Sequence, residues 1–241
     1  MILRRLRPYV AALLIFGASF IGAAPPASVV AASSSPPACA FKDVPAKNAS
    51  YADWDITVLD TIYELPKSYV PPKLVSTAKA GLRGGGEVRS IVIPDLKAMA
   101  SAARMADSGL RVLSAYRSWH SQQSLYRREV QRYGSRTARG SVARAGHSEH
   151  QLGVTIDFGS ASTRGDVSQK FAKTAAGRWM KSNAWKFGWI LSYPSGKTSK
   201  TCYYYEPWHY RYVGRDLAAK VHASGLTLRE YLWKNYASKT A

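Results

Sequence analysis

The chain has 241 residues, of which 46% are hydrophobic and 12% aromatic, enough for one or two packed domains, and this composition excludes global disorder. Its 34 lysine and arginine residues against 15 acidic residues give a net charge of +19, which predicts attraction to a polyanion without identifying it. No apolar run of about 18 residues lies beyond the N-terminus, which excludes a multi-span membrane protein.

The N-terminus predicts a secretory signal peptide. Three arginines precede an apolar run from Tyr9 to about Ala24, which is followed by small residues. We expect the signal to occupy residues 1–32 and a flexible lead-out, rich in Pro, Ala and Ser, to occupy residues 33–53. An uncleaved signal anchor is the alternative, because the apolar run is long. Export predicts a secreted or envelope-associated protein whose partners are anionic wall polymers or a lipid surface, not nucleic acid.

The chain has two cysteines, Cys39 in the lead-out and Cys202 near the C-terminus. In an oxidising compartment a disulfide between them is the simplest interpretation. A lipid-modified Cys39 is the alternative, although the residues before it lack a leucine and lie far from the apolar run.

The first half of the folded region predicts two helices around a strand. Residues 51–65 and the proline-containing segment after them indicate an extended, wrapping arm. The pattern then predicts a helix with Pro94 in its first turn and Gly109 as its stop, a short buried strand, a second helix and a basic loop. The strand spans residues 110–118, the second helix spans 121–134 and the basic loop spans 135–146.

The second half continues the irregular alternation of helices and strands. It predicts strands at 154–158, 189–194 and 201–213, one or two amphipathic helices over 167–188, and a closing helix at 227–238. No internal repeat is present. We therefore predict an α+β fold with a small, mainly antiparallel sheet flanked by helices.

Residues able to perform chemistry gather in two clusters. In the strand at 154–158, alternation places Ile156 and Phe158 toward the core and Asp157 toward a cleft. His150 lies seven residues upstream of Asp157, before a glycine that allows the loop to approach the strand closely.

The second cluster places Glu206 and His209 three residues apart around a proline that interrupts regular strand pairing. Two histidines and one carboxylate form a three-ligand set for catalytic zinc, which leaves the fourth position for water. Zinc lowers the pKa of such a water toward about 7, and Glu206 is placed to take its proton and pass it to a leaving amine. The pattern therefore predicts metal-assisted amide hydrolysis.

Four strings, SAYRSWHSQQ, GHSEHQLGVTIDFG, ILSYP and YEPWHYRYVG, resemble in order and spacing the motifs of the VanY-type D-alanyl-D-alanine carboxypeptidases, zinc peptidases that trim peptidoglycan stem peptides. The resemblance implies His150, Asp157 and His209 as zinc ligands and Glu206 as the general base. It also implies that Arg117 binds the terminal carboxylate or the developing oxyanion.

Three further polar residues, Gln122, Ser148 and Tyr193, match substrate-pocket positions of this family, although each could equally make structural hydrogen bonds. His147 is an alternative to His150 as a ligand, ranked lower because the motif aligns on His150. Ser192 stands where the family often has arginine.

We therefore expect residues 54–241 to form the catalytic domain of an exported zinc carboxypeptidase that removes the C-terminal D-alanine from peptidoglycan stem peptides. Cleavage of a D,D bond and of an L,D bond would use the same metal ligands, so the metal motif does not distinguish the two specificities. An endopeptidase of the same fold is the first alternative, and a non-catalytic, basic wall-binding module is the second.

Overall fold

The central sheet places the predicted chemical clusters on neighbouring strands. The computed structural model describes residues 35–163 and 167–237, so the predicted signal peptide lies outside the described residues. Within them, a five-stranded sheet has the order β4-β6-β7-β9-β8. Within this sheet the β4–β6 pair is parallel and the other three pairs are antiparallel. The strands are β4 (Arg83–Gly84), β6 (Arg111–Ser114), β7 (Thr155–Gly159), β8 (Trp189–Leu191) and β9 (His209–Tyr212).

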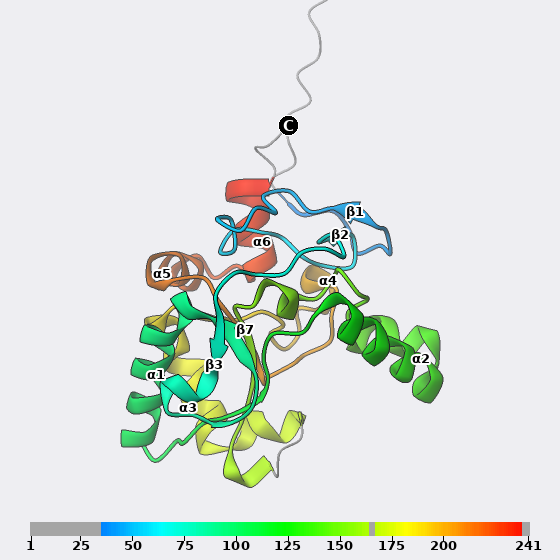
Figure 1. Cartoon of the computed structure of the whole chain (residues 1–241). Coiled ribbons are helices and arrows are strands. Elements are labelled where there is room, and N and C mark those ends of the chain that lie inside the picture. Colours follow the sequence, from blue (N-terminus) through cyan, green and yellow to red (C-terminus); the bar gives the residue numbers. More distant parts are fainter. Residues whose placement is uncertain (1–34, 164–166, 238–241) are drawn as a thin grey trace, which may run out of the picture. The chain divides into compact units, whose positions relative to one another are not determined.

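Helices flank this sheet, as the α+β prediction requires (Figure 1). They are α1 (Ile93–Met105), α2 (Trp119–Ser141), α3 (Ala175–Asn183), α4 (Thr198–Thr201), α5 (Arg215–Ser224) and α6 (Leu228–Leu232). Short turns of 3-10 helix link them, including η3 (Glu149–Leu152) and η6 (Ala184–Phe187). In the part of the chain that is described, none of the helices has the length and apolar character needed to cross a bilayer.

One face of the sheet is closed by α1 and α3, which lie side by side in Figure 1. Leu96 and Met99 of α1 and Met180 of α3 share a buried cluster with Ile156 and Phe158 of β7. These side chains are less than 1% exposed, so removing them from water supplies the main stabilising free energy of this layer. The core-facing side of β7 is therefore as predicted.

The predicted N-terminal arm runs along the domain with little regular structure. It contributes one strand to each of two short ladders. The parallel ladder pairs β1 (Val44–Pro45) with β2 (Tyr63–Glu64), and the antiparallel ladder pairs β3 (Leu74–Ser76) with β5 (Glu87–Arg89). Val58 of the arm is buried in a second cluster with Leu217 of α5 and Leu228 of α6. The arm thus completes the packing of the C-terminal helices.

Three predicted boundaries were wrong. The first helix ends at Met105, because Asp107 takes a left-handed conformation (φ 50°) before Gly109 is reached. The predicted loop at 135–146 is helical up to Ser141, although α2 is interrupted at Gly134 (φ 80°). Its second segment is held by tertiary contacts, since Ala138 is buried and the carbonyl of Gly140 accepts a hydrogen bond from the amide of Tyr204.

The third correction concerns the aromatic run at 201–213, of which only β9 is a strand. Thr201 ends α4, and Cys202 follows it in a left-handed conformation (φ 70°), which directs the chain away from the sheet. Tyr203 is buried and Tyr204 lies against Gly140, where an added Cβ would approach the tyrosine ring to 2.5 Å. The tyrosines therefore pack as a loop over α2 instead of pairing as a strand.

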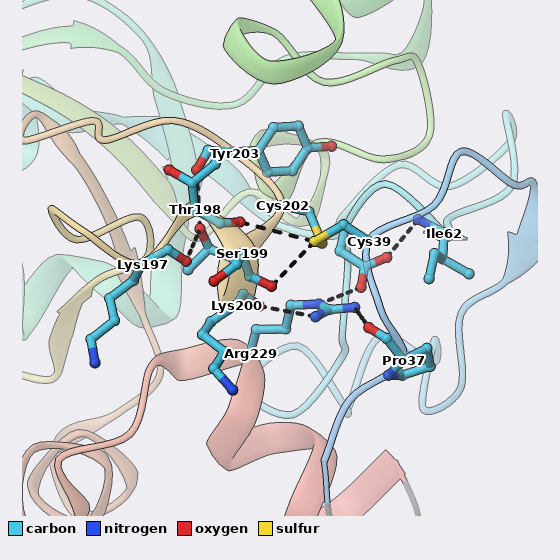
Figure 2. Close-up of a disulfide and its surroundings, with 12 residues drawn as sticks. Pro37, Cys39, Ile62, Lys197, Thr198, Ser199, Lys200, Cys202, Tyr203 and Arg229 are labelled. Carbon is cyan, nitrogen blue, oxygen red and sulfur yellow. Dashed lines mark hydrogen bonds and ion pairs between the residues drawn. A yellow bond between two sulfur atoms is a disulfide. The ribbon is translucent and has the colours of Figure 1, made fainter.

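The predicted disulfide between Cys39 and Cys202 is confirmed (Figure 2). The two Cα atoms are 5.4 Å apart and 163 residues apart in sequence. Arg229 of α6 spans the two joined segments, donating hydrogen bonds to the carbonyl of Pro37 at 3.0 Å and of Lys200 at 2.9 Å (Figure 2). Part of the predicted lead-out is thus fixed to the folded domain.

Replacing both cysteines, Cys39→Ser with Cys202→Ser, should lower the free energy of unfolding by about 2 to 4 kcal/mol, because the unfolded chain regains the entropy that a long closed loop removes. Urea unfolding of the oxidised protein and of the double variant measures the difference. Reduced wild-type protein is the control and should behave like the variant. Equal stability of all three forms would contradict the proposed contribution of the disulfide.

Candidate metal centre

The register of three adjacent strands aligns the candidate ligands. Ser114 of β6 pairs with Asp157 of β7, and Asp157 pairs with His209 of β9. Because directly paired residues project to the same face of a sheet, their side chains gather on the face opposite the α1 and α3 core. Thr155 and Arg211 form the next pair along that face.

His150 reaches this row from η3. Ser148 caps η3 by accepting a hydrogen bond from the His150 amide at 3.3 Å, and Gly153 ends it in a left-handed conformation (φ 72°). A Cβ at Gly153 would come within 2.8 Å of Pro71, so both the turn and the packing require glycine there. The sequence predicts that this glycine lets the loop approach the strand closely.

Each histidine has one ring nitrogen held by an outer acceptor and the other turned toward Asp157. In His150, Nδ1 lies 2.6 Å from the carbonyl oxygen of Ala115, which can only accept, so Nδ1 donates and Nε2 offers its lone pair. That Nε2 is 3.2 Å from Oδ2 of Asp157. Outer hydrogen bonds of this kind fix the tautomer and orientation of metal-binding histidines.

In His209 the roles of the ring nitrogens are reversed. Nε2 lies 2.9 Å from Oε2 of Glu149, and Nδ1 lies 3.2 Å from Oδ1 of Asp157. Burial would raise the pKa of Glu149, but Arg211, His209 and Ser192 outweigh it and lower that pKa to about 2. The Glu149 carboxylate is therefore ionised and accepts from Nε2, which leaves Nδ1 available as a ligand.

These three residues fit a metal ion. One donor atom from each of His150, Asp157 and His209 lies within 4.8 Å of the other two, and all three residues are buried. Among the described residues, no hydrogen bond of good geometry reaches the buried Oδ1 of Asp157. A buried carboxylate oxygen without a hydrogen bond is costly unless a cation compensates it.

The electrostatics of the centre also favour a cation. Burial opposes protonation of His209, but hydrogen bonds with Asp157 and Glu149 outweigh it and raise the pKa of His209 to about 10. Despite burial, His150 and His209 hold the pKa of Asp157 well below its usual range. Acidic groups that favour positive charge on an imidazole favour a metal cation at the same place.

Glu206 lies beside the centre without belonging to the ligand group. Its Oε2 is 3.5 Å from Nδ1 of His209, and its amide donates to the carbonyl of Tyr193 at 3.1 Å. Burial raises the pKa of Glu206 to about 8, despite the opposing charges of His209 and Arg117, and the negative charge of Asp157 raises it further. A carboxyl group in this range can accept and return a proton near neutral pH.

Arg117 is held on the other side of Asp157. Its Nη2 donates a hydrogen bond to Ser114 Oγ at 2.8 Å and lies 3.7 Å from Oδ2 of Asp157. Its Nη1 donates to Oε1 of Gln122 at 2.8 Å, and Gln122 in turn donates to the carbonyl of Ala143 at 2.6 Å. Gln122 therefore orients the guanidinium as well as lining the cleft.

The structure brings the other predicted pocket residues to the same cleft, except His147. Ser148 and Tyr193 both line it, and the Tyr193 ring lies 4.6 Å from the His209 ring. His147 lies elsewhere, with Nδ1 2.8 Å from the carbonyl of Asp60 and Nε2 3.0 Å from Oδ1 of Asp43. His147 is thus not an alternative to His150 in the ligand group.

Sequence reasoning missed Glu149 and its role behind His209. Arg211 donates to Oε1 of Glu149 at 3.0 Å, and Ser192 donates to Oε2 at 2.6 Å. The position of Glu149 between two histidines was the available signal, but its partners are 43 to 62 residues away in the chain. Ser192, which departs from the common family residue, thus supports Glu149.

The centre opens into a cleft of about 530 Å³. The candidate ligands, Arg117 and Glu206 line one part of it, and α2 supplies another wall through Leu125, Glu129 and Tyr133. The cleft is large enough to hold several residues of a peptide beside the metal centre.

A family model described as D-alanyl-D-alanine carboxypeptidase, VanY, matches residues 86–215 of this chain. The chain belongs to the VanY family. The family and the fold class predicted from the sequence are confirmed.

Named relatives agree with this membership. The Bacillus subtilis protein YodJ is 37% identical over 186 residues, covering 74% of this chain and 67% of YodJ. The LdcB LD-carboxypeptidase structure has a TM-score of 0.67 and 36% identity, covering 73% of this chain and 84% of LdcB. A mutant of the vancomycin resistance D,D-pentapeptidase VanY, solved with Zn(II), has a TM-score of 0.62 and 31% identity, covering 74% of this chain and 99% of that one. Zinc, the predicted cofactor, is thus the metal bound by a solved member of the family.

Glu149 provides a test of the ligand assignment. Glu149→Gln keeps the size of the side chain but removes the charge behind His209, so zinc affinity should fall by about 10- to 100-fold. His209→Ala should lose most of the metal. Competition with a chelating dye measures the affinity after circular dichroism has verified folding.

The matched control is Glu87→Gln, an exposed acid on β5, which should bind zinc like the wild type. Unchanged affinity in Glu149→Gln would remove Glu149 from the support of the centre. Full zinc content in His209→Ala would remove His209 from the ligand group.

Proposed function

We propose that this chain is an exported zinc carboxypeptidase that removes the C-terminal D-alanine from peptidoglycan stem peptides. The observation that carries the proposal is the convergence of His150, Asp157 and His209 beside Glu206 and Arg117 in one cleft. The first three residues are the proposed ligands. The proposed domain division is a signal at residues 1–32, a lead-out at 33–53 and a catalytic domain at 54–241.

A bound zinc ion would supply a Lewis acid and lower the pKa of a coordinated water toward about 7. Glu206 would accept a proton from the attacking water and later deliver it to the amine of the departing D-alanine. Its half-buried position next to His209 supports this role, since a base must lie within reach of the reacting atoms.

Arg117 would bind the terminal carboxylate of the substrate. A guanidinium can form two parallel, charge-assisted hydrogen bonds with a carboxylate. Ser114 and Gln122 hold its guanidinium group in place, which supports this role. A guanidinium that is already oriented loses less conformational entropy when it binds a carboxylate. Ser148 and Tyr193 would complete the polar lining of the pocket.

Exposed arginines on α2 support an anionic wall polymer as a second partner. Arg127, Arg128, Arg132, Arg136 and Arg139 are all exposed on this helix, which has no lysine. Guanidinium groups suit phosphate and carboxylate recognition. The predicted export of the chain would bring this helix to such polymers.

Glu206→Gln tests the general base. The substitution preserves size and removes the proton acceptor, so turnover should fall by at least about 10²-fold while zinc remains bound. Turnover is measured from released D-alanine with pentapeptide and tetrapeptide substrates, and zinc is measured by elemental analysis. Loss of metal would recast Glu206 as a ligand, and an unchanged rate would exclude it from the reaction.

Arg117 tests the choice between carboxypeptidase and endopeptidase. Amidation of the terminal D-alanine should cost about 2 to 4 kcal/mol in transition-state binding, because a neutral amide cannot match the guanidinium. Measurements of kcat/KM on free and amidated peptides, for wild type, Arg117→Lys and Arg117→Ala, check this prediction.

We expect Arg117→Lys to recover only part of the activity lost in Arg117→Ala, since a lysine ammonium group cannot form the two parallel hydrogen bonds of a guanidinium. Equal cleavage of free and amidated peptides by the wild type would favour the endopeptidase. Comparison of the pentapeptide with the tetrapeptide distinguishes D,D from L,D specificity.

A further inference from the structure

Glu129 is a carboxylate in the cleft that the proposed reaction does not use. It lies on α2, is half-buried, and lines the cleft together with the metal centre. Among the described residues, its hydrogen bond from Ser141 Oγ is long, at 3.4 Å, and no cation lies within 4.0 Å of it. Unlike Glu87 and Asp107, which are exposed acids away from the cleft, Glu129 therefore has a carboxylate beside the substrate site.

The other carboxylates that line the cleft have partners at the metal centre. Asp157 contacts His150 and His209 at 3.2 Å each, and Glu206 contacts His209 at 3.5 Å. Within the described lining, Glu129 is therefore the carboxylate available to bind a positive group of the substrate.

Helix geometry relates Glu129 to the carboxylate-binding end of the cleft. Gln122, which holds Arg117, and Glu129 are seven residues apart, which places them on the same side of α2, about 10 Å apart along its axis. Leu125 lines the cleft between them. An extended peptide advances about 3.3 to 3.6 Å per residue, so this distance corresponds to about three residues.

We propose that Glu129 binds the side-chain ammonium of a diamino acid residue upstream of the scissile bond. In a substrate whose terminal carboxylate is bound by Arg117, a residue one or two positions before the terminal residue could reach Glu129, because its long side chain spans part of the distance. The two charged groups would then fix the register of the peptide across the metal centre. This inference rests on the proposed carboxypeptidase function.

The arginines next to Glu129 in sequence do not neutralise it. Arg127, Arg128 and Arg132 are exposed, and none lies within 4.0 Å of its carboxylate. Their charges are screened by solvent and salt, whereas a contact inside the cleft is screened less. They do weaken the attraction for an ammonium group, so a moderate preference is expected.

The test compares two peptides that differ only in charge. Both carry lysine followed by D-alanine in tetrapeptide and pentapeptide series, with the lysine side chain either free or acetylated. In wild-type protein, acetylation should lower kcat/KM by about tenfold, as expected for a hydrogen bond to a charged group. In Glu129→Gln, the two peptides should be cleaved at equal rates.

Asp107→Asn is the matched control, since it removes one exposed negative charge after α1, outside the described lining of the cleft. It should keep the wild-type preference. Glu129→Lys should prefer a succinylated lysine, which carries a carboxylate, over free lysine. This reversal separates recognition of charge from a change in folding.

The outcomes distinguish this inference from the function on which it rests. If wild-type protein cleaves free and acetylated peptides equally, or if Glu129→Gln retains the preference, Glu129 does not bind the ammonium, and the carboxypeptidase proposal stands. If Glu129→Lys still prefers free lysine, the inference is also overturned. If wild-type protein loaded with zinc cleaves none of the peptides, the proposed function fails and this inference fails with it.

Discussion

The direct pairing of Asp157 with His209 across β7 and β9 is the constraint on which the candidate site depends. Sheet register sets this pair, because a slip of one residue would turn both side chains toward the hydrophobic layer. That layer, with Ile156 and Phe158 packed on α1 and α3, makes the slip costly. The free energy of core burial thus fixes two donor atoms, and η3 adds the third from His150.

A second consequence is that buried charge has to be balanced behind the histidines. Glu149 accepts from His209, and Arg211, less than 2% exposed, pairs with Glu149. Removing one partner of such a buried pair leaves an uncompensated charge, which costs more than the pair itself stabilises. The outer residues therefore set both the tautomer of the ligand and the stability of the sheet face that carries it.

The sequence was sufficient to predict the features that depend on local pattern. Alternation in β7 distinguished Asp157 from Ile156, and the family motifs pointed to His150 and His209. Glu149 was missed because its role appears only when β9 and the loop after β8 lie beside it. The run at 201–208 was misread as strand because aromatic residues favour strands, whereas tertiary packing against Gly140 determines the fold there.

This misread segment links the disulfide to the cleft. Cys39 holds Cys202, and the next residue, Tyr203, packs its ring 5.0 Å from that of Tyr193. Tyr193 in turn lies against His209. Because Tyr203 and Tyr193 both line the cleft, the cross-link limits the motion of a wall of the substrate site. The segment that would follow an export signal thus contributes to the packing of the candidate site, although it supplies none of the proposed ligands.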